Sequence, residues 1–281
     1  MNTKVVLITG ALTGIGHATA LAFAKDGWAW VLWVAIGDIA KTVAVATSSI
    51  ANQPISGVHS DGGYAEMMIA QASGLAAIPD DLLSTEAAPL LCAGLTTFNG
   101  LRNSKARPGE LVAIQGVGGL GHLGIQFARR MGFQVAAIAR GVEKETLAKK
   151  LWAHHYIDSN SQDPVAALQA LGGARLILAT AANSKSMSPL LGGLAPRGQL
   201  IVAGAGGDEP IEVNPVPLLF GMRSIAGTMT GSSIDAEDTL SFSSLQGIRP
   251  MIETVPLANA AEAYGRMMRN EARFRIVLVT G

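Results

Sequence analysis

Short apolar runs alternate with amphipathic stretches between about residues 111 and 203. The runs are apolar over most of their length, which favours strands buried on both faces. They lie at residues 111–115, 134–139, 175–180 and 198–203, and stretches with a helical period lie between them at 123–131, 143–152 and 186–194. Strands that alternate with helices in this way predict an α/β fold with a doubly wound parallel sheet.

The beginning of the chain predicts another strand, glycine turn and helix. An apolar run at 4–8 leads into the glycine-containing residues 9–16 and the Ala- and Leu-rich residues 17–25. Glycines in such a turn let the backbone approach a phosphate at the helix N-terminus. The order Thr-Gly-x-x-x-Gly-x-Gly resembles the opening of short-chain dehydrogenases, over residues 1–27 only. That family's catalytic Tyr-x-x-x-Lys is absent, since none of the three tyrosines has a lysine four places later.

From residue 52 onwards the chain carries a second series of motifs. They are Gly62-Gly63-Tyr64-Ala65-Glu66, Ile78-Pro79-Asp80, the segment from Glu86 to Phe98, Pro108-Gly109-Glu110, and a tail that contains Arg273-Phe274-Arg275. In this order they resemble the zinc-type medium-chain alcohol dehydrogenases, over about residues 52–279. The resemblance implies a Rossmann nucleotide-binding domain and a GroES-like β catalytic domain, which is incomplete because the family's N-terminal half is missing here.

The two resemblances divide the chain into four parts. They predict a short-chain-dehydrogenase-like fragment at 1–27, a junction at 28–51, a remnant of the catalytic domain at 52–100 plus 237–281, and a dinucleotide-binding domain at 101–236. The junction differs in texture from both neighbours, because three of the four Trp residues fall between positions 28 and 33. No helical or strand period is visible there.

A glycine pattern lies between the strand predicted at 111–115 and the helix predicted at 123–131. The pattern Gly116-x-Gly118-Gly119-Leu120-Gly121 in this context indicates a dinucleotide-binding loop. Gly116 would make the turn, Gly118 would admit the pyrophosphate, and Gly121 would let helix and strand pack closely. The alternative is that the glycines serve only a tight strand-to-helix turn.

The choice of dinucleotide depends on the end of the next strand, where a carboxylate would bind the ribose 2′-OH of NAD. Ala139-Arg140-Gly141 stands there, so a guanidinium is available to a 2′-phosphate and the residues favour NADP over NAD. The alternative is that Arg140 is a solvated loop charge. The resemblance adds Thr96 near the nicotinamide and Arg275 near the cofactor.

Zinc is the point at which the chain departs from the family pattern. In zinc-type alcohol dehydrogenases a Cys₂His set holds Zn²⁺, which acts as a Lewis acid toward the substrate oxygen. Cys92 matches the last of these ligands, and it is the chain's single cysteine. Cys92 is therefore the one catalytic and metal-binding candidate, in an incomplete site. The five histidines are expected in loop, cap or packing roles, so the residues give little support for a zinc cofactor.

Reading the junction out of frame would account for the absence of the family's four-cysteine structural zinc lobe. With permitted synonymous codons, a one-base shift gives the order Gly-Tyr-Cys-x-x-Cys-Arg-x-Gly, which resembles the four-cysteine structural zinc lobe of the family. The hypothesis is that two dehydrogenase genes were joined out of frame near Gly27 and that the frame was restored near Ala51.

Composition excludes several classes of partner. Lys+Arg and Asp+Glu both number 21, so the charge balance gives no reason to expect nucleic acid or an anionic membrane surface. The first residues lack the features of a signal peptide, and the densest apolar run, 28–36, is far shorter than the roughly 20 residues of a membrane helix. A single cysteine gives no disulfide framework, so the cytoplasm is the expected location.

Two classes of function are compatible with these observations. The first is an NAD(P)-dependent oxidoreductase that transfers a hydride between a nicotinamide and a small alcohol or aldehyde, with zinc-free reduction, as in quinone reductases, as a variant. The second is a non-catalytic NAD(P)-binding remnant or fusion protein. The resemblance also implies a homodimer through the sheet edge near residues 215–220 and 224–227.

The frame-shift hypothesis predicts the nucleotide sequence of the junction. The shifted frame across codons 28–50 should contain the cysteine codons of the zinc lobe in the order given above. Sequencing the gene checks this directly, and a shifted frame without those codons would refute the hypothesis.

Overall fold

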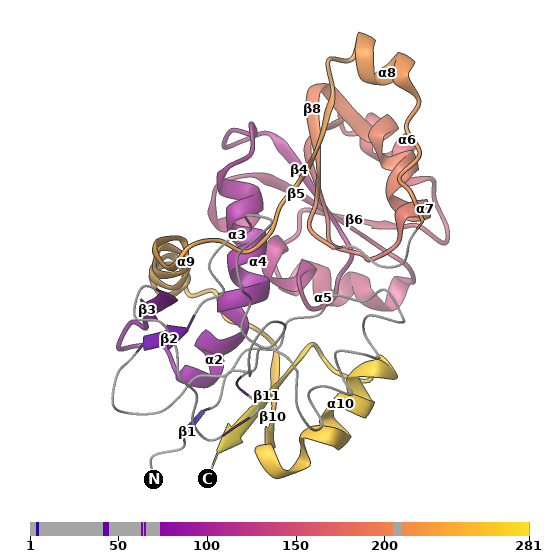
Figure 1. The fold of residues 1–281 in the computed structure, drawn as a ribbon. Coiled ribbons are helices and arrows are strands. Elements are labelled where there is room, and N and C mark those ends of the chain that lie inside the picture. Colours follow the sequence, from indigo (N-terminus) through magenta and orange to yellow (C-terminus); the bar gives the residue numbers. More distant parts are fainter. Residues whose placement is uncertain are drawn as a thin grey trace. The chain divides into compact units, whose positions relative to one another are not determined.

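The computed structural model describes residues 4–5, 42–44, 63, 65, 74–204 and 209–280. The predicted glycine turn at 9–16, its helix at 17–25 and most of the junction lie outside the described residues. The chain divides into two compact units, residues 1–96 with 229–281 and residues 97–228. Figure 1 shows the elements of both units along the chain.

The unit 97–228 is built on a six-stranded sheet in which every pair of neighbours is parallel. The strands are β4 (Leu111–Gln115), β5 (Gln134–Ala139), β6 (His155–Asp158), β7 (Ala174–Ala179), β8 (Leu194–Val202) and β9 (Ser224–Gly227). Their spatial order is β6-β5-β4-β7-β8-β9, the 3-2-1-4-5-6 order of a doubly wound Rossmann sheet. The predicted α/β fold with a parallel sheet is therefore confirmed.

Helices connect the strands of this sheet, and polar caps begin several of them. The connections contain α4 (Gly121–Arg130), the 3₁₀ helix η3 (Val142–Lys144), α5 (Glu145–Lys150), α6 (Pro164–Ala170), α7 (Ser184–Met187), the 3₁₀ helix η4 (Ser188–Gly193) and α8 (Pro215–Phe220). Asp163 caps α6 and Asn214 caps α8, each ahead of a proline in the first turn. Among the described residues, no helix is long and apolar enough to cross a membrane.

The predicted elements differ from the observed ones mainly at their ends. β4 and β5 have the predicted bounds. The helix predicted at 186–194 is instead the short α7 followed by η4, because Pro189 and two glycines disfavour a continuous α-helix. The short, partly exposed β6 was not predicted at all.

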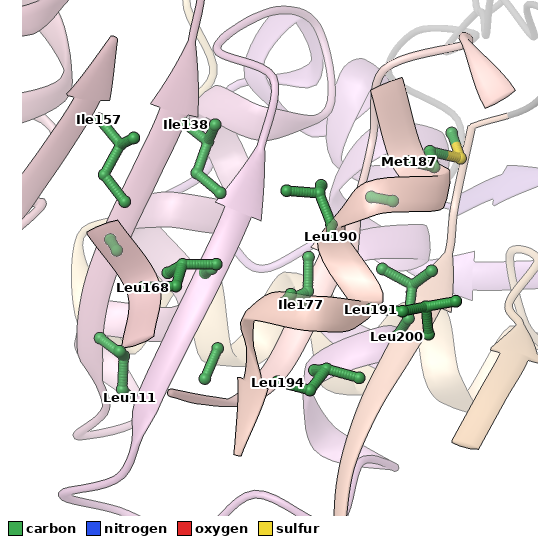
Figure 2. Close-up of a cluster of buried hydrophobic side chains, with 14 residues drawn as sticks. Leu111, Ile138, Ile157, Leu168, Ile177, Met187, Leu190, Leu191, Leu194 and Leu200 are labelled. Carbon is green, nitrogen blue, oxygen red and sulfur yellow. The ribbon is translucent and has the colours of Figure 1, made fainter. Parts of the chain in front are cut away.

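Both faces of the sheet are covered by apolar side chains. On one face, Ile138 and Ile177 pack in a cluster with Leu168 of α6 and Leu190 of η4 (Figure 2). On the other face, a Cβ added to Gly124 of α4 would lie 3.5 Å from a methyl carbon of Ile114. Burial on both faces explains why the central strands are nearly continuous apolar runs.

The other unit joins the segment around residues 74–96 to the C-terminal segment. Its elements are β1 (Lys4–Val5), β2 (Thr42–Ala44), β3 (Leu75–Ala77), α2 (Ser84–Pro89), the π-helix η2 (Leu90–Gly94), α9 (Ser233–Gln246), β10 (Ile252–Pro256), the 3₁₀ helix η5 (Leu257–Asn259), α10 (Ala260–Met268) and β11 (Arg275–Thr280). β11 lies between β1, which is antiparallel to it, and β10, which is parallel. One helix belongs partly to each unit. This is α3 (Leu95–Arg102), whose first two residues belong to the unit 1–96 with 229–281 and whose remaining residues belong to the unit 97–228.

Polar contacts tie these distant segments together. Ser244 Oγ donates to the carboxylate of Asp81 at 2.7 Å, and Arg249 Nε lies 3.2 Å from a carboxylate oxygen of Glu86. The backbone N–H of Ala77 donates to Glu237 Oε1 at 3.0 Å. The segment around 74–96 and the tail therefore form one structural unit although more than 130 residues separate them.

The central strands should be the most sensitive part of the sheet. Ile177 is fully buried in β7 and pairs with Ala113 and Leu200 on the neighbouring strands. Ile177→Ala should lower the free energy of unfolding by about 2–5 kcal/mol, because it leaves a cavity in the core. The control Leu245→Ala changes a side chain that is 79% exposed and should cost less than about 0.5 kcal/mol. Chemical denaturation measures both, and equal losses would contradict the core assignment.

Candidate functional site

The glycine loop lies at the point where the strand order of the sheet reverses. Gly116 directly follows β4, and Thr180 directly follows the neighbouring strand β7. Thr180 donates from both its backbone N–H and its hydroxyl to the carbonyl of Gln115, at 3.0 and 2.7 Å. The connections after these two strands diverge, and doubly wound sheets bind their ligands in the crevice that results.

The loop requires glycine at two positions for different reasons. A Cβ on Gly121 would lie 1.7 Å from the carbonyl oxygen of Gly116, so no side chain fits between the first turn of α4 and the end of β4. Gly116 itself has φ +97°, a conformation that favours glycine. A Cβ on Gly118, in contrast, would meet no atom within 4 Å. Open space at Gly118, just before the N-terminus of α4, suits a pyrophosphate.

His122 stabilises the glycine loop through hydrogen bonds to the carbonyl of Gly118. It is fully buried, and the carbonyl oxygen of Gly118 accepts from the backbone N–H of His122 at 3.0 Å and from its Nδ1 at 2.8 Å. Since a carbonyl oxygen can only accept, Nδ1 carries a proton. Gln126 Nε2 in turn donates to the carbonyl of His122 at 3.0 Å. These bonds fix the orientation of the Gly118 peptide.

Arg140 follows the last residue of β5, where the sequence pattern predicted it. It is exposed, and its guanidinium makes no hydrogen bond or ion pair with any residue that the structure describes. Two side chains of β6, which sequence reasoning missed, bind the residue after it. Asp158 Oδ1 accepts from the backbone N–H of Gly141 at 2.8 Å, and the Tyr156 hydroxyl donates to the Gly141 carbonyl at 2.5 Å.

The ionisation of these two side chains suits their roles. Burial raises the pKa of Tyr156 to about 12, and the nearby carboxylates of Asp158, Glu143 and Glu145 act in the same direction. Hydrogen bonds from the backbone N–H groups of Asn160 and Gly141 lower the pKa of Asp158. At neutral pH Tyr156 is therefore a protonated donor and Asp158 a charged acceptor.

The remaining predicted residues lie in the other unit. Cys92 is half-buried in η2, and Thr96 is buried four residues later in α3. Arg275 is buried at the start of β11. Burial lowers the pKa of Arg275, while the negative charge of a Cys92 thiolate acts to raise it. The structure thus brings Cys92 and Arg275 close together within one unit, and places Arg140 with the glycine loop in the other.

The described residues do not form a zinc site. Within the described ranges, no group of three His, Cys, Asp or Glu side chains is arranged to hold a metal ion. A tetrahedral catalytic zinc needs three protein ligands. Cys92 alone therefore does not fit a zinc ion, and no chemical step is assigned to one.

Comparison with known proteins places these residues in context. The zinc-binding dehydrogenase family profile matches residues 119–244. An alcohol dehydrogenase of Geobacillus stearothermophilus is 37% identical over 256 residues, which cover 90% of this chain and 75% of that protein. The alcohol dehydrogenase patD of Penicillium expansum is 44% identical over 227 residues. That match covers 81% of this chain and 66% of the fungal protein. The chain therefore spans about two thirds of the length of this relative.

Solved structures share the fold at lower identity. The alcohol dehydrogenase of Aeropyrum pernix has a TM-score of 0.78 and 22% identity, with 99% of this chain and 92% of that chain covered. Acetophenone reductase of Geotrichum candidum, solved in complex with NAD, has a TM-score of 0.77 and 18% identity, with 99% and 89% covered. The protein named CAD from Helicobacter pylori, complexed with NADP(H), has a TM-score of 0.60 and 23% identity, with 74% and 58% covered.

The two glycines provide a matched pair of variants. Gly118→Ala should leave the free energy of unfolding within about 0.5 kcal/mol of wild type, because the added methyl meets open space. It should weaken NADPH binding at least about tenfold, because the methyl occupies the approach of the pyrophosphate. Gly121→Ala should destabilise the fold by about 1–3 kcal/mol or more, because its methyl overlaps a backbone carbonyl. Denaturation and fluorescence titration separate the two effects, and unchanged NADPH binding by Gly118→Ala would contradict the pyrophosphate assignment.

Proposed function

Because the chain belongs to the zinc-type medium-chain alcohol dehydrogenase family, we propose that it is an NAD(P)-dependent oxidoreductase that transfers a hydride between the nicotinamide and a small alcohol or aldehyde. The observation that carries the proposal is the open glycine loop at the switch point between β4 and β7. Two of the relatives are named alcohol dehydrogenases, which supports the same reaction for this chain.

The chain's own residues divide the work of holding the cofactor. Gly118, Gly119 and Leu120 form the loop before α4 that would receive the pyrophosphate, and Gly121 lets that helix approach the end of β4. By resemblance to the family, Thr96 lies near the nicotinamide and Arg275 near the cofactor. The bound nicotinamide supplies the hydride chemistry.

The cofactor preference in this proposal is NADP over NAD. Arg140 is exposed at the end of β5 and makes no hydrogen bond or ion pair within the described ranges, so its guanidinium is available to a 2′-phosphate. A planar guanidinium binds phosphate through two N–H groups at once. The residue before it is Ala139, so the chain lacks at that position the carboxylate that would select the ribose 2′-OH of NAD.

The main competing proposal is a non-catalytic NAD(P)-binding protein. It is favoured by the single cysteine, because this chain cannot supply two cysteines to a Cys₂His zinc site. A zinc-free enzyme of the quinone-reductase kind is the intermediate case, in which positioning of substrate and cofactor replaces the metal. The non-catalytic protein and the zinc-free enzyme would both bind the cofactor, but only the zinc-free enzyme would turn over a substrate.

The N-terminal parts of the chain and their origin belong to the same proposal. We retain residues 1–27 as a short-chain-dehydrogenase-like fragment, 28–51 as a frame-shifted junction, 52–100 plus 237–281 as the catalytic-domain remnant, and 101–236 as the nucleotide domain. We also propose a cytoplasmic location, since the composition gives no reason to expect disulfides, a membrane or nucleic acid.

Self-association is also part of the proposal. Strand β9 is the last strand of the six-stranded sheet, and α8 precedes it in the chain. Leu219 and Phe220 of α8 are 72% and 81% exposed, and Met222 follows them on the surface. Exposed apolar side chains and a strand at the end of a sheet, as β9 is among the described strands, are both typical of interfaces. We therefore propose a homodimer through this edge.

Cofactor titration, zinc analysis and a turnover assay on the purified full chain test the proposed function together. NADPH should bind more tightly than NADH, and an alcohol should reduce the bound oxidised cofactor. Cofactor binding without zinc or turnover would overturn the catalytic proposal in favour of the non-catalytic one. Turnover without zinc would favour the quinone-reductase variant, and binding of neither cofactor would overturn all three.

A further inference from the structure

We propose that Tyr156 and Asp158 are positioning residues for cofactor choice, which hold the turn that presents Arg140 to the 2′-phosphate of NADP. The inference rests on the proposed function as an NAD(P)-dependent enzyme. It concerns two side chains of β6 that belong to neither the glycine loop nor the end of β5.

Three backbone groups around Arg140 are fastened to the end of β6. The carbonyl of Ala139 accepts from the backbone N–H of Ser159 at 2.9 Å. The N–H of Gly141 donates to Asp158, and its carbonyl accepts from the Tyr156 hydroxyl. The backbone on both sides of Arg140 is therefore held by the neighbouring strand, while the Arg140 side chain stays exposed.

The turn contains a glycine in a conformation that other residues rarely adopt. Gly141 has φ +90°, which L side chains rarely adopt. A Cβ at this position would lie 2.1 Å from Glu143 Oε2, so the carboxylate of Glu143 folds back over the turn. A flexible glycine next to the charge that is to be positioned has to be restrained by other groups.

The restraint matters because several carboxylates lie near the Tyr156 end of this turn. Glu143, Glu145 and Asp158 are all close enough to Tyr156 to raise its pKa. A guanidinium released from a fixed turn samples many positions, including ones turned toward these carboxylates, and is less often in place for a 2′-phosphate. In the structure one oxygen of Asp158 is already taken by the N–H groups of Gly141 and Asn160, and Arg140 pairs with no described residue.

The expected consequence is selective for the 2′-phosphate. NADP carries that phosphate and NAD does not, so a displaced Arg140 weakens NADPH binding and leaves NADH binding nearly unchanged. A general loss of structure would weaken both. The ratio of the two dissociation constants therefore separates a positioning role from a merely structural one.

The test measures the dissociation constants of NADPH and NADH for the full chain by fluorescence titration. Tyr156→Phe removes only the hydroxyl, and Asp158→Ala removes the acceptor of the Gly141 N–H. Each should raise the dissociation constant of NADPH roughly 3- to 10-fold and that of NADH less than about twofold. Asp158→Asn keeps an acceptor oxygen and should restore part of the ratio.

Asp163→Ala is the matched control. Asp163 also accepts a backbone N–H through its carboxylate, that of Val165 at 2.9 Å, but it caps α6. This variant should lose stability as a capping variant does and leave the NADPH-to-NADH ratio unchanged. A shift of the ratio in the control would overturn the inference.

A double-mutant cycle tests whether the effect passes through Arg140. In an Arg140→Ala background, Asp158→Ala should no longer alter the NADPH-to-NADH ratio, because the group that it positions is gone. A further change in that background, or unchanged ratios in both single variants while Arg140→Ala shifts the ratio, would overturn the inference and leave the proposed function standing. Binding of neither nucleotide by the wild-type chain would instead overturn the proposed function.

Discussion

Burial of the parallel sheet on both faces is the constraint on which the rest of the nucleotide unit depends. A strand that is covered above and below can reach solvent only at its ends, and a doubly wound parallel sheet places its ligand site outside the carboxyl ends of its strands, at one edge of the sheet. Gly116, Arg140 and Thr180 all stand at that edge, one residue after β4, β5 and β7. Their proximity follows from the topology of the sheet, although they are 24 and 40 residues apart along the chain.

The same edge shows how backbone and side chains share the task of forming a site. At the β4 end the backbone itself makes the surface, because Gly121 approaches a carbonyl and Gly118 leaves room. At the end of β5 the side chain of Arg140 is exposed to solvent, and Tyr156 and Asp158 of the neighbouring strand β6 hold the backbone of the next residue, Gly141. The loop after β4 is therefore shaped by glycines, which have no side chains, and the turn after β5 is shaped by side-chain hydrogen bonds from β6.

The sequence allowed the fold to be predicted wherever burial leaves a periodic pattern. β4, β5 and the glycine loop were found at their observed positions, because apolar strands and a strand-to-helix glycine run are strong local patterns. β6 was missed because His155, Tyr156 and Asp158 give it no apolar run, although it completes the Arg140 turn. Which of its side chains reach Gly141 depends on the register that pairs Ala139 with Asp158, and no local pattern encodes that register.

The discontinuous unit has a consequence for synthesis on the ribosome. The unit 97–228 is continuous, so all of its strands have been made once Thr228 has emerged. The segment around 74–96 instead contains fully buried residues such as Leu90 and Leu91, and the tail that joins it in one unit is translated after the nucleotide unit. During elongation this segment stays without its C-terminal partners while an entire Rossmann sheet is being completed. Chaperone binding and premature degradation of the nascent chain should therefore concentrate on this segment rather than on the nucleotide unit.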